Sequence, residues 1–171
     1  NQTRYLRELE KEYRQLKDIL EQAEEKGLCQ LEIHAAATID SILDTFTKYR
    51  NRIAIFHFAG HANGYQLLLE SSEGQTVTAD AGGLAAFLGQ QSGLQLVFLN
   101  GCSTQPQAQG LLDVGVSSVI ATSRLIDDQV AMDFASRFYQ SLTSGSTIRI
   151  AYNEATEAVK TDKGGDPRAL Y

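Results

Sequence analysis

The chain has 171 residues, of which 43% are apolar and 21% charged, a composition typical of one globular domain and unlike that of a disordered segment. The formal net charge of −6 repels phosphate backbones and so disfavours nucleic acid as a partner. No apolar run approaches the roughly 18 residues that a membrane span needs, and no signal-peptide pattern is present, so we expect no membrane partner.

Period-3.6 spacing of apolar residues predicts helices over residues 3–26, 39–49, 81–90, 107–113, 128–142 and 147–161. Period-two or continuous β-prone runs predict strands over 28–35, 52–59, 94–99 and 117–122, with a hairpin over 65–79. Thr38, Asp80 and Ser146 stand at predicted helix N-termini, where their side chains serve as caps.

The alternation of strands and helices predicts an α/β fold with a mostly parallel central sheet, helices on both faces and a small β-hairpin. We expect one domain over residues 1–171. Because the chain starts at Asn1 without a methionine and stops at Tyr171 without a closing signal, we also expect it to be a piece of a longer multidomain protein.

The two cysteines, Cys29 and Cys102, lie in contexts unlike those of a disulfide framework. Cys29 belongs to an alternating apolar segment, whereas Cys102 belongs to a loop rich in Gly, Ser and Thr. Free thiols indicate a reducing compartment, so we expect a cytoplasmic location.

Two predicted strands run directly into residues that carry chemistry. Gly60-His61-Ala62 follows the first and Gly101-Cys102-Ser103 follows the second; reactive residues of parallel sheets collect at such carboxyl ends. A cysteine attacks as a thiolate, which a nearby histidine favours, and backbone amides can hold the resulting oxyanion. We expect His61 and Cys102 to be the catalytic pair, with the amides of Ala62 and Cys102 as oxyanion donors.

A structural role for each of these residues stays open on spacing alone. Cysteines after strands often act as small buried apolar residues, and histidines at strand ends are often hydrogen-bonded structural residues. The same structural interpretation is favoured for His57, inside the strand before His61, and for His34. No two-His-plus-carboxylate or Cys-pair spacing is present, so we expect no metal and no other cofactor.

The motifs Phe58-Ala-Gly-His-Ala62 and Val97-Phe-Leu-Asn-Gly-Cys-Ser-Thr104 resemble those of the CHAT branch of the caspase-like cysteine peptidases. Residues 118–151 also resemble the third portion of that family. The resemblance implies a caspase-like three-layer sandwich in which His61 is the catalytic histidine and Cys102 the nucleophile. It further implies a protein or peptide substrate and control by regulatory or sensor domains of the same longer chain.

The loop after the fourth predicted strand carries three charged residues, Arg124, Asp127 and Asp128. A resemblance to separases implies that an aspartate here pairs with a basic substrate residue before the scissile bond. Asp128 is equally suited to capping the next helix. Arg124 would instead favour an acidic substrate residue.

Two rival functions belong to other classes. One is a catalytically silent signalling or scaffold domain that keeps the caspase-like fold. The other is a flavodoxin-like nucleotide-binding domain, which is disfavoured because no glycine-rich phosphate loop follows a strand; Asp80-Ala-Gly-Gly83, the nearest match, lacks the lysine and hydroxyl residue of a P-loop.

Overall fold

A computed structural model of the chain describes residues 2–60, 62–63, 66–70, 76–101, 104–122 and 127–162. The chain forms two compact units, one comprising Asn1–Ile33 with Ile126–Tyr171 and the other His34–Leu125. We refer to them as the helical unit and the sheet unit.

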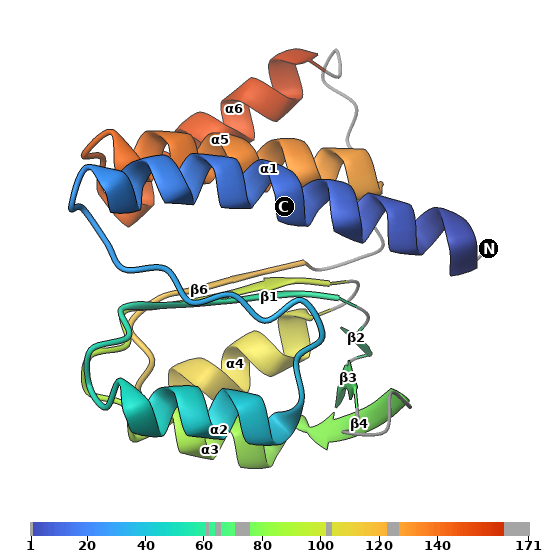
Figure 1. The fold of residues 1–171 in the computed structure, drawn as a ribbon, viewed down its shortest axis with the longest axis vertical. Coiled ribbons are helices and arrows are strands. Elements are labelled where there is room, and N and C mark those ends of the chain that lie inside the picture. Colours follow the sequence, from blue (N-terminus) through green and yellow to red (C-terminus); the bar gives the residue numbers. More distant parts are fainter. Residues whose placement is uncertain are drawn as a thin grey trace. The chain divides into compact units, whose positions relative to one another are not determined.

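The helical unit is built from α1 (Gln2–Glu25), α5 (Asp128–Thr143) and α6 (Ile148–Asp162), and α5 contacts both of the others (Figure 1). Aromatic side chains of α5 are buried, and the Phe134 ring meets Tyr152 of α6 edge-on at 5.6 Å between centroids. Burial, with a smaller contribution from the Glu12 carboxylate of α1, raises the pKa of Tyr139 on α5. In the part of the chain that the structure describes, no helix has both the length and the apolar character needed to cross a membrane.

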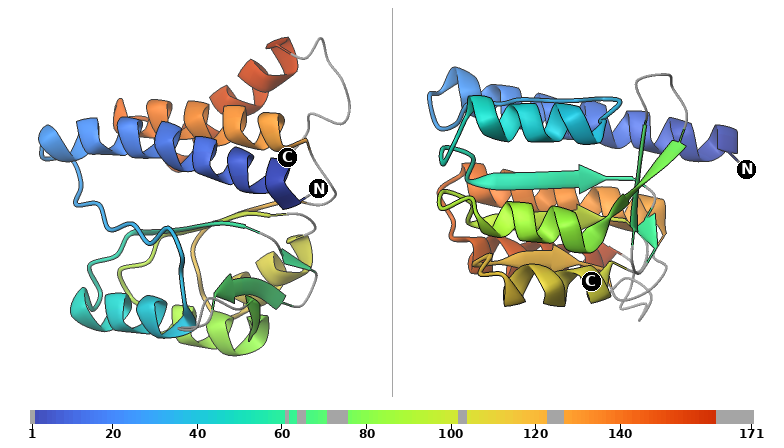
Figure 2. Two further views of the ribbon diagram at one scale, coloured as in Figure 1. Left: turned by 45° about the vertical axis from the view of Figure 1, so that its right-hand side comes forward. Right: turned by 90° about the horizontal axis from the view of Figure 1, so that it is seen from below.

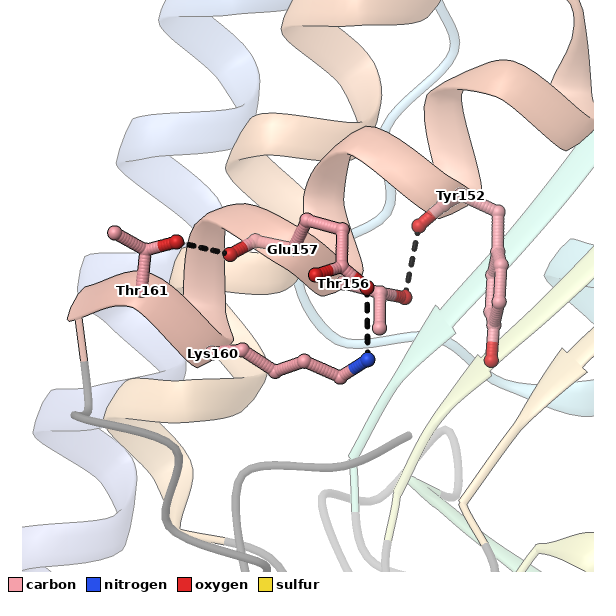
Figure 3. Close-up of polar contacts among 5 residues, drawn as sticks. All are labelled: Tyr152, Thr156, Glu157, Lys160 and Thr161. Carbon is pink, nitrogen blue, oxygen red and sulfur yellow. Dashed lines mark hydrogen bonds and ion pairs between the residues drawn. The ribbon is translucent and has the colours of Figure 1, made fainter.

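Side chains of α6 form hydrogen bonds with residues three or four positions earlier in the same helix (Figure 3). The hydroxyls of Thr156 and Thr161 donate to carbonyls one turn earlier, and Lys160 Nζ lies 2.8 Å from Glu157 Oε1. At its start, the Thr147 hydroxyl accepts from the backbone N–H of Ile150 at 3.3 Å. The capping residue is therefore Thr147, and the prediction of Ser146 is wrong by one position.

The sheet unit contains a parallel sheet of β1 (Ile55–Ala59), β5 (Leu96–Asn100) and β6 (Val119–Ala121), in the order β1-β5-β6. The helices α2 (Ile39–Lys48), α3 (Ala81–Gly89) and α4 (Gln105–Asp113) all lie on one side of this sheet (Figures 1 and 2). An antiparallel sheet of β2 (Ala62–Asn63), β3 (Gln66–Glu70) and β4 (Thr76–Asp80) separates β1 from α3 along the chain.

The core of the sheet unit forms where β5 meets these helices. Every residue of β5 is buried, as a central parallel strand requires. Val97 and Leu99 pack in one cluster with Phe46 of α2, Leu88 of α3 and Leu111 of α4. The alternation of strand side chains thus directs one face of β5 toward all three helices.

Two helices of this unit, α2 and α3, begin at the predicted caps. Thr38 and Ser41 form a reciprocal capping box at the start of α2, with both backbone-to-side-chain distances at 3.0 Å. Asp80 Oδ2 accepts from the backbone N–H of Gly83 at 2.7 Å at the start of α3. Each cap satisfies a backbone donor that the first helical turn leaves without a partner.

The predicted α/β class, with a mostly parallel sheet and a small hairpin, is confirmed. The strand predicted over residues 28–35 is wrong, because this segment forms no strand. Here a backbone group bonds to a side chain instead of to a neighbouring strand: the N–H of Leu31 donates to Glu24 Oε1 at 2.8 Å. Its apolar residues do not share a buried face, since Leu28 is 60% and Ile33 39% exposed.

Gly93 is required for the contact between two loops of the sheet unit. A Cβ at Gly93 would lie 2.2 Å from the carbonyl oxygen of Asn51, whose side chain also accepts from the N–H of Ser92 at 3.2 Å. Gly93→Ala must push these loops apart, so we expect it to lower the free energy of unfolding by about 1–3 kcal/mol, measured by urea denaturation.

Gly110→Ala is the matched control. Gly110 lies inside α4, and a Cβ there would meet nothing within 4 Å. We expect no loss, and a gain of up to about 1 kcal/mol from helix propensity. Equal effects of the two substitutions would show that the loop contact does not constrain Gly93.

Candidate functional site

The register of β1 and β5 determines which residues meet at the carboxyl end of the sheet. The last pair in the ladder is Ala59 with Asn100, and the N–H of Gly60 donates to the carbonyl of Asn100 at 3.3 Å. His61 and Cys102 each stand two positions beyond this pair in the sequence. Both lie outside the residues that the structure describes, so the meeting of their side chains stays a prediction.

Gly60, which precedes His61, lies too close to the Phe58 ring to leave room for a side chain. A Cβ there would lie 2.8 Å from Cζ of the Phe58 ring, and the residue has no positive φ. Glycine is therefore not needed at this position for a left-handed backbone conformation. The Phe58 side chain, 7% exposed, occupies the volume that a larger residue at position 60 would need.

A short strand follows position 61 in the sequence. Ala62 and Asn63 form β2, paired antiparallel with Leu67 and Gln66 of β3. The use of the Ala62 amide as an oxyanion donor stays a prediction. The amide of Cys102 lies outside the described residues.

The loop between β5 and α4 is tied to the end of β6 by two buried threonines that the sequence analysis missed. Thr104 is 0% and Thr122 1% exposed. The N–H of Thr122 donates to Thr104 Oγ1 at 3.0 Å, and the N–H of Gln105 donates to the carbonyl of Thr122 at 3.0 Å. The available signal for Thr122 was a hydroxyl residue directly after an apolar stretch, where burial forces it to find a partner. Thr104 follows a polar segment and carries no such signal.

The other two histidines make contacts away from the sheet end. His57 pairs with Phe98 across β1 and β5, and the two rings lie 4.6 Å apart between centroids. His34 Nε2 lies 3.0 Å from the hydroxyl of Thr45 on α2. These contacts agree with the structural interpretation of both residues.

Asp127 caps α5. Its Oδ1 accepts from the backbone N–H of Gln129 at 2.9 Å, so the cap is one residue earlier than the predicted Asp128. Arg124 and the Asp128 side chain lie outside the described residues. A role for any of the three in substrate binding stays a prediction.

Cys29 provides an internal reference thiol. It is exposed and its Sγ lies 4.0 Å from the carbonyl of Leu20. Partial desolvation, together with the Glu24 carboxylate, raises the pKa of Cys29 above its ordinary value. The thiolate needed for nucleophilic attack is therefore scarce at this residue at neutral pH.

No group of three or more His, Cys, Asp or Glu side chains in the described ranges is placed to hold a metal ion. The family model of the CHAT domain matches residues 2–169. No curated protein matches the sequence. Because the family match covers nearly the whole chain, this protein belongs to the CHAT domain family, which is related to the caspase-like cysteine peptidases.

Proposed function

We propose that this protein is a cysteine endopeptidase in which Cys102 is the nucleophile and His61 the general acid and base. The observation that carries the proposal is the β1–β5 register, with its terminal Gly60–Asn100 bond. Because of this register, the motifs that contain His61 and Cys102 continue from the paired residues Ala59 and Asn100 of neighbouring parallel strands. Membership of a peptidase-related family supports the same chemistry.

The reaction proceeds by acyl transfer. The Cys102 thiolate attacks the scissile carbonyl carbon, forming a C–S bond while the carbonyl oxygen takes up negative charge. The oxyanion collapses and the C–N bond breaks as His61 gives a proton to the leaving amine. Water then attacks the thioester, His61 accepts a proton from it, and the thiolate leaves. The net reaction consumes one water and yields an acid and an amine.

The substrates are proteins cut at few sites, and regulatory or sensor domains of the same longer chain control the reaction. The nucleophile works only as a reduced thiol, which supports our proposal of a reducing compartment such as the cytoplasm. The amides of Ala62 and Cys102 hold the oxyanion, and no cofactor takes part in any of these steps.

The rate of thiol alkylation tests the proposed pair. Cys102 should react with iodoacetamide at pH 6–7 at least about ten-fold faster than Cys29, because an imidazolium lowers a thiol pKa while desolvation and Glu24 raise that of Cys29. Alkylation of each residue is followed by mass spectrometry across pH. Cys29 should gain reactivity only as the pH rises toward the raised pKa of its thiol.

His61→Ala is the paired variant. It should abolish the fast phase at Cys102 and leave Cys29 unchanged, and both His61→Ala and Cys102→Ala should lose peptide cleavage with an unchanged unfolding midpoint. Similar profiles for the two cysteines in the folded protein would contradict an activated thiol and favour a silent scaffold domain.

Substrate preference tests the acidic residues at the start of α5. If Asp127 or Asp128 meets the residue before the scissile bond, Arg or Lys there gains a charge-assisted pair of about 1.5–3 kcal/mol. This corresponds to roughly ten- to over a hundred-fold in kcat/KM within a peptide library. Arg124 opposes the effect if it faces the same pocket.

Asparagine variants separate charge from capping. Asn caps helices as well as Asp does, so Asp127→Asn keeps the bond to Gln129 while removing the charge. We expect one of Asp127→Asn and Asp128→Asn to abolish the basic preference without loss of stability. A preference for apolar or acidic residues, unchanged in both variants, would show that these aspartates do not bind substrate and serve only at the start of α5.

A further inference from the structure

Two carbonyls, of Leu99 and Gly101, and the hydroxyls of Thr104 and Thr122 form one cluster where β5 and β6 end. The Thr104 hydroxyl lies 3.2 Å from the carbonyl of Leu99, 3.3 Å from the Thr122 hydroxyl and 3.4 Å from the carbonyl of Gly101. The Thr122 hydroxyl donates to the carbonyl of Gly101. The carbonyl that immediately precedes the candidate nucleophile thus accepts from a buried threonine hydroxyl.

Burial makes this cluster costly to break. Both threonines are essentially inaccessible to water, so a hydroxyl or carbonyl that lost its partner here would stay without one. The N–H of Thr122 occupies one acceptor site of Thr104, which leaves the Thr104 proton for the three nearby oxygens. The carbonyl of Gly101 is therefore held in one direction from the β6 side.

A peptide group is planar, and its trans form holds the N–H opposite to the C=O. The direction of a carbonyl therefore sets the direction of the N–H in the same peptide group. The proposed function assigns the amide that follows Gly101 to the oxyanion.

We infer that Thr104 and Thr122 are positioning residues that hold the Gly101 carbonyl and thereby aim the adjoining amide at the oxyanion. The inference rests on the proposed function. If the threonines only supported the loop, they would have no effect on the transition state. The inference gives them such an effect, because they orient an oxyanion donor. Preorganised donors of this kind act without reorganisation during the reaction.

Two small electrophiles distinguish the two roles. Iodoacetamide is attacked at its CH₂ carbon and releases iodide, so no oxyanion forms. 4-Nitrophenyl acetate is attacked at its carbonyl carbon, passes through an oxyanion and releases 4-nitrophenolate as the thioester forms. A positioning role predicts that only the second reaction depends on the threonine hydroxyl.

The experiment uses the chain with Cys29→Ser, which leaves Cys102 as its single thiol. Thr122→Val should slow acylation by 4-nitrophenyl acetate at least about ten-fold, since outright loss of an oxyanion donor costs about 10²–10³. Its alkylation by iodoacetamide should change less than about two-fold, and Thr122→Ser should restore acylation. Thr104→Val and Thr104→Ser repeat the comparison from the second hydroxyl.

Thr156→Val is the matched control, because it removes a threonine hydroxyl that donates to a helix carbonyl at 2.8 Å in α6 (Figure 3). It should leave both rates unchanged. Unchanged acylation in Thr122→Val, or an equal fall of both rates, would overturn the positioning role while the proposed function stood. Absence of fast alkylation and of acylation in the Cys29→Ser parent would overturn the proposed function itself.

Discussion

Parallel pairing of β1 with β5 is the constraint on which the rest of the site depends. The ladder runs in one register from Ile55 with Leu96 to Ala59 with Asn100. Because side chains alternate between the faces of a strand, a slip of one residue would reverse the face of every later side chain on one strand relative to the other. The core opposes such a slip, since Val97 and Leu99 are packed against three helices. Hydrophobic burial in the sheet unit thereby sets the relation between two motifs about forty positions apart in the sequence.

Polar contacts of the candidate site lie at the carboxyl end of this apolar ladder. Gly60 leaves room for the Phe58 ring, and Thr104 and Thr122 join the loop after β5 to the end of β6. Such buried hydroxyl clusters are stable only when every member is bonded, so this one specifies how Thr104 meets Thr122. A rigid frame of this kind suits catalysis by preorganised backbone donors.

Much of this fold could be predicted from local signals, whereas the failures lie where tertiary contacts decide. Thr38 and Asp80 cap their helices as predicted, because a cap depends on neighbours in sequence. The alternating segment after α1 is not a strand, since alternation reports a strand only when one face is buried. The pairing of Thr104 with Thr122 joins residues 18 positions apart, and no local pattern indicates which distant hydroxyl a buried threonine will meet.

The distance between the Cys102 Sγ and the nearer imidazole nitrogen of His61 tests the central claim most directly. A crystal structure of the free protein at pH 7 would measure it. The register of β1 and β5 predicts a separation of about 4–7 Å, close enough to tighten into a hydrogen bond when substrate binds. Side chains that point to opposite faces of the sheet, out of reach of each other in any rotamer, would contradict the account.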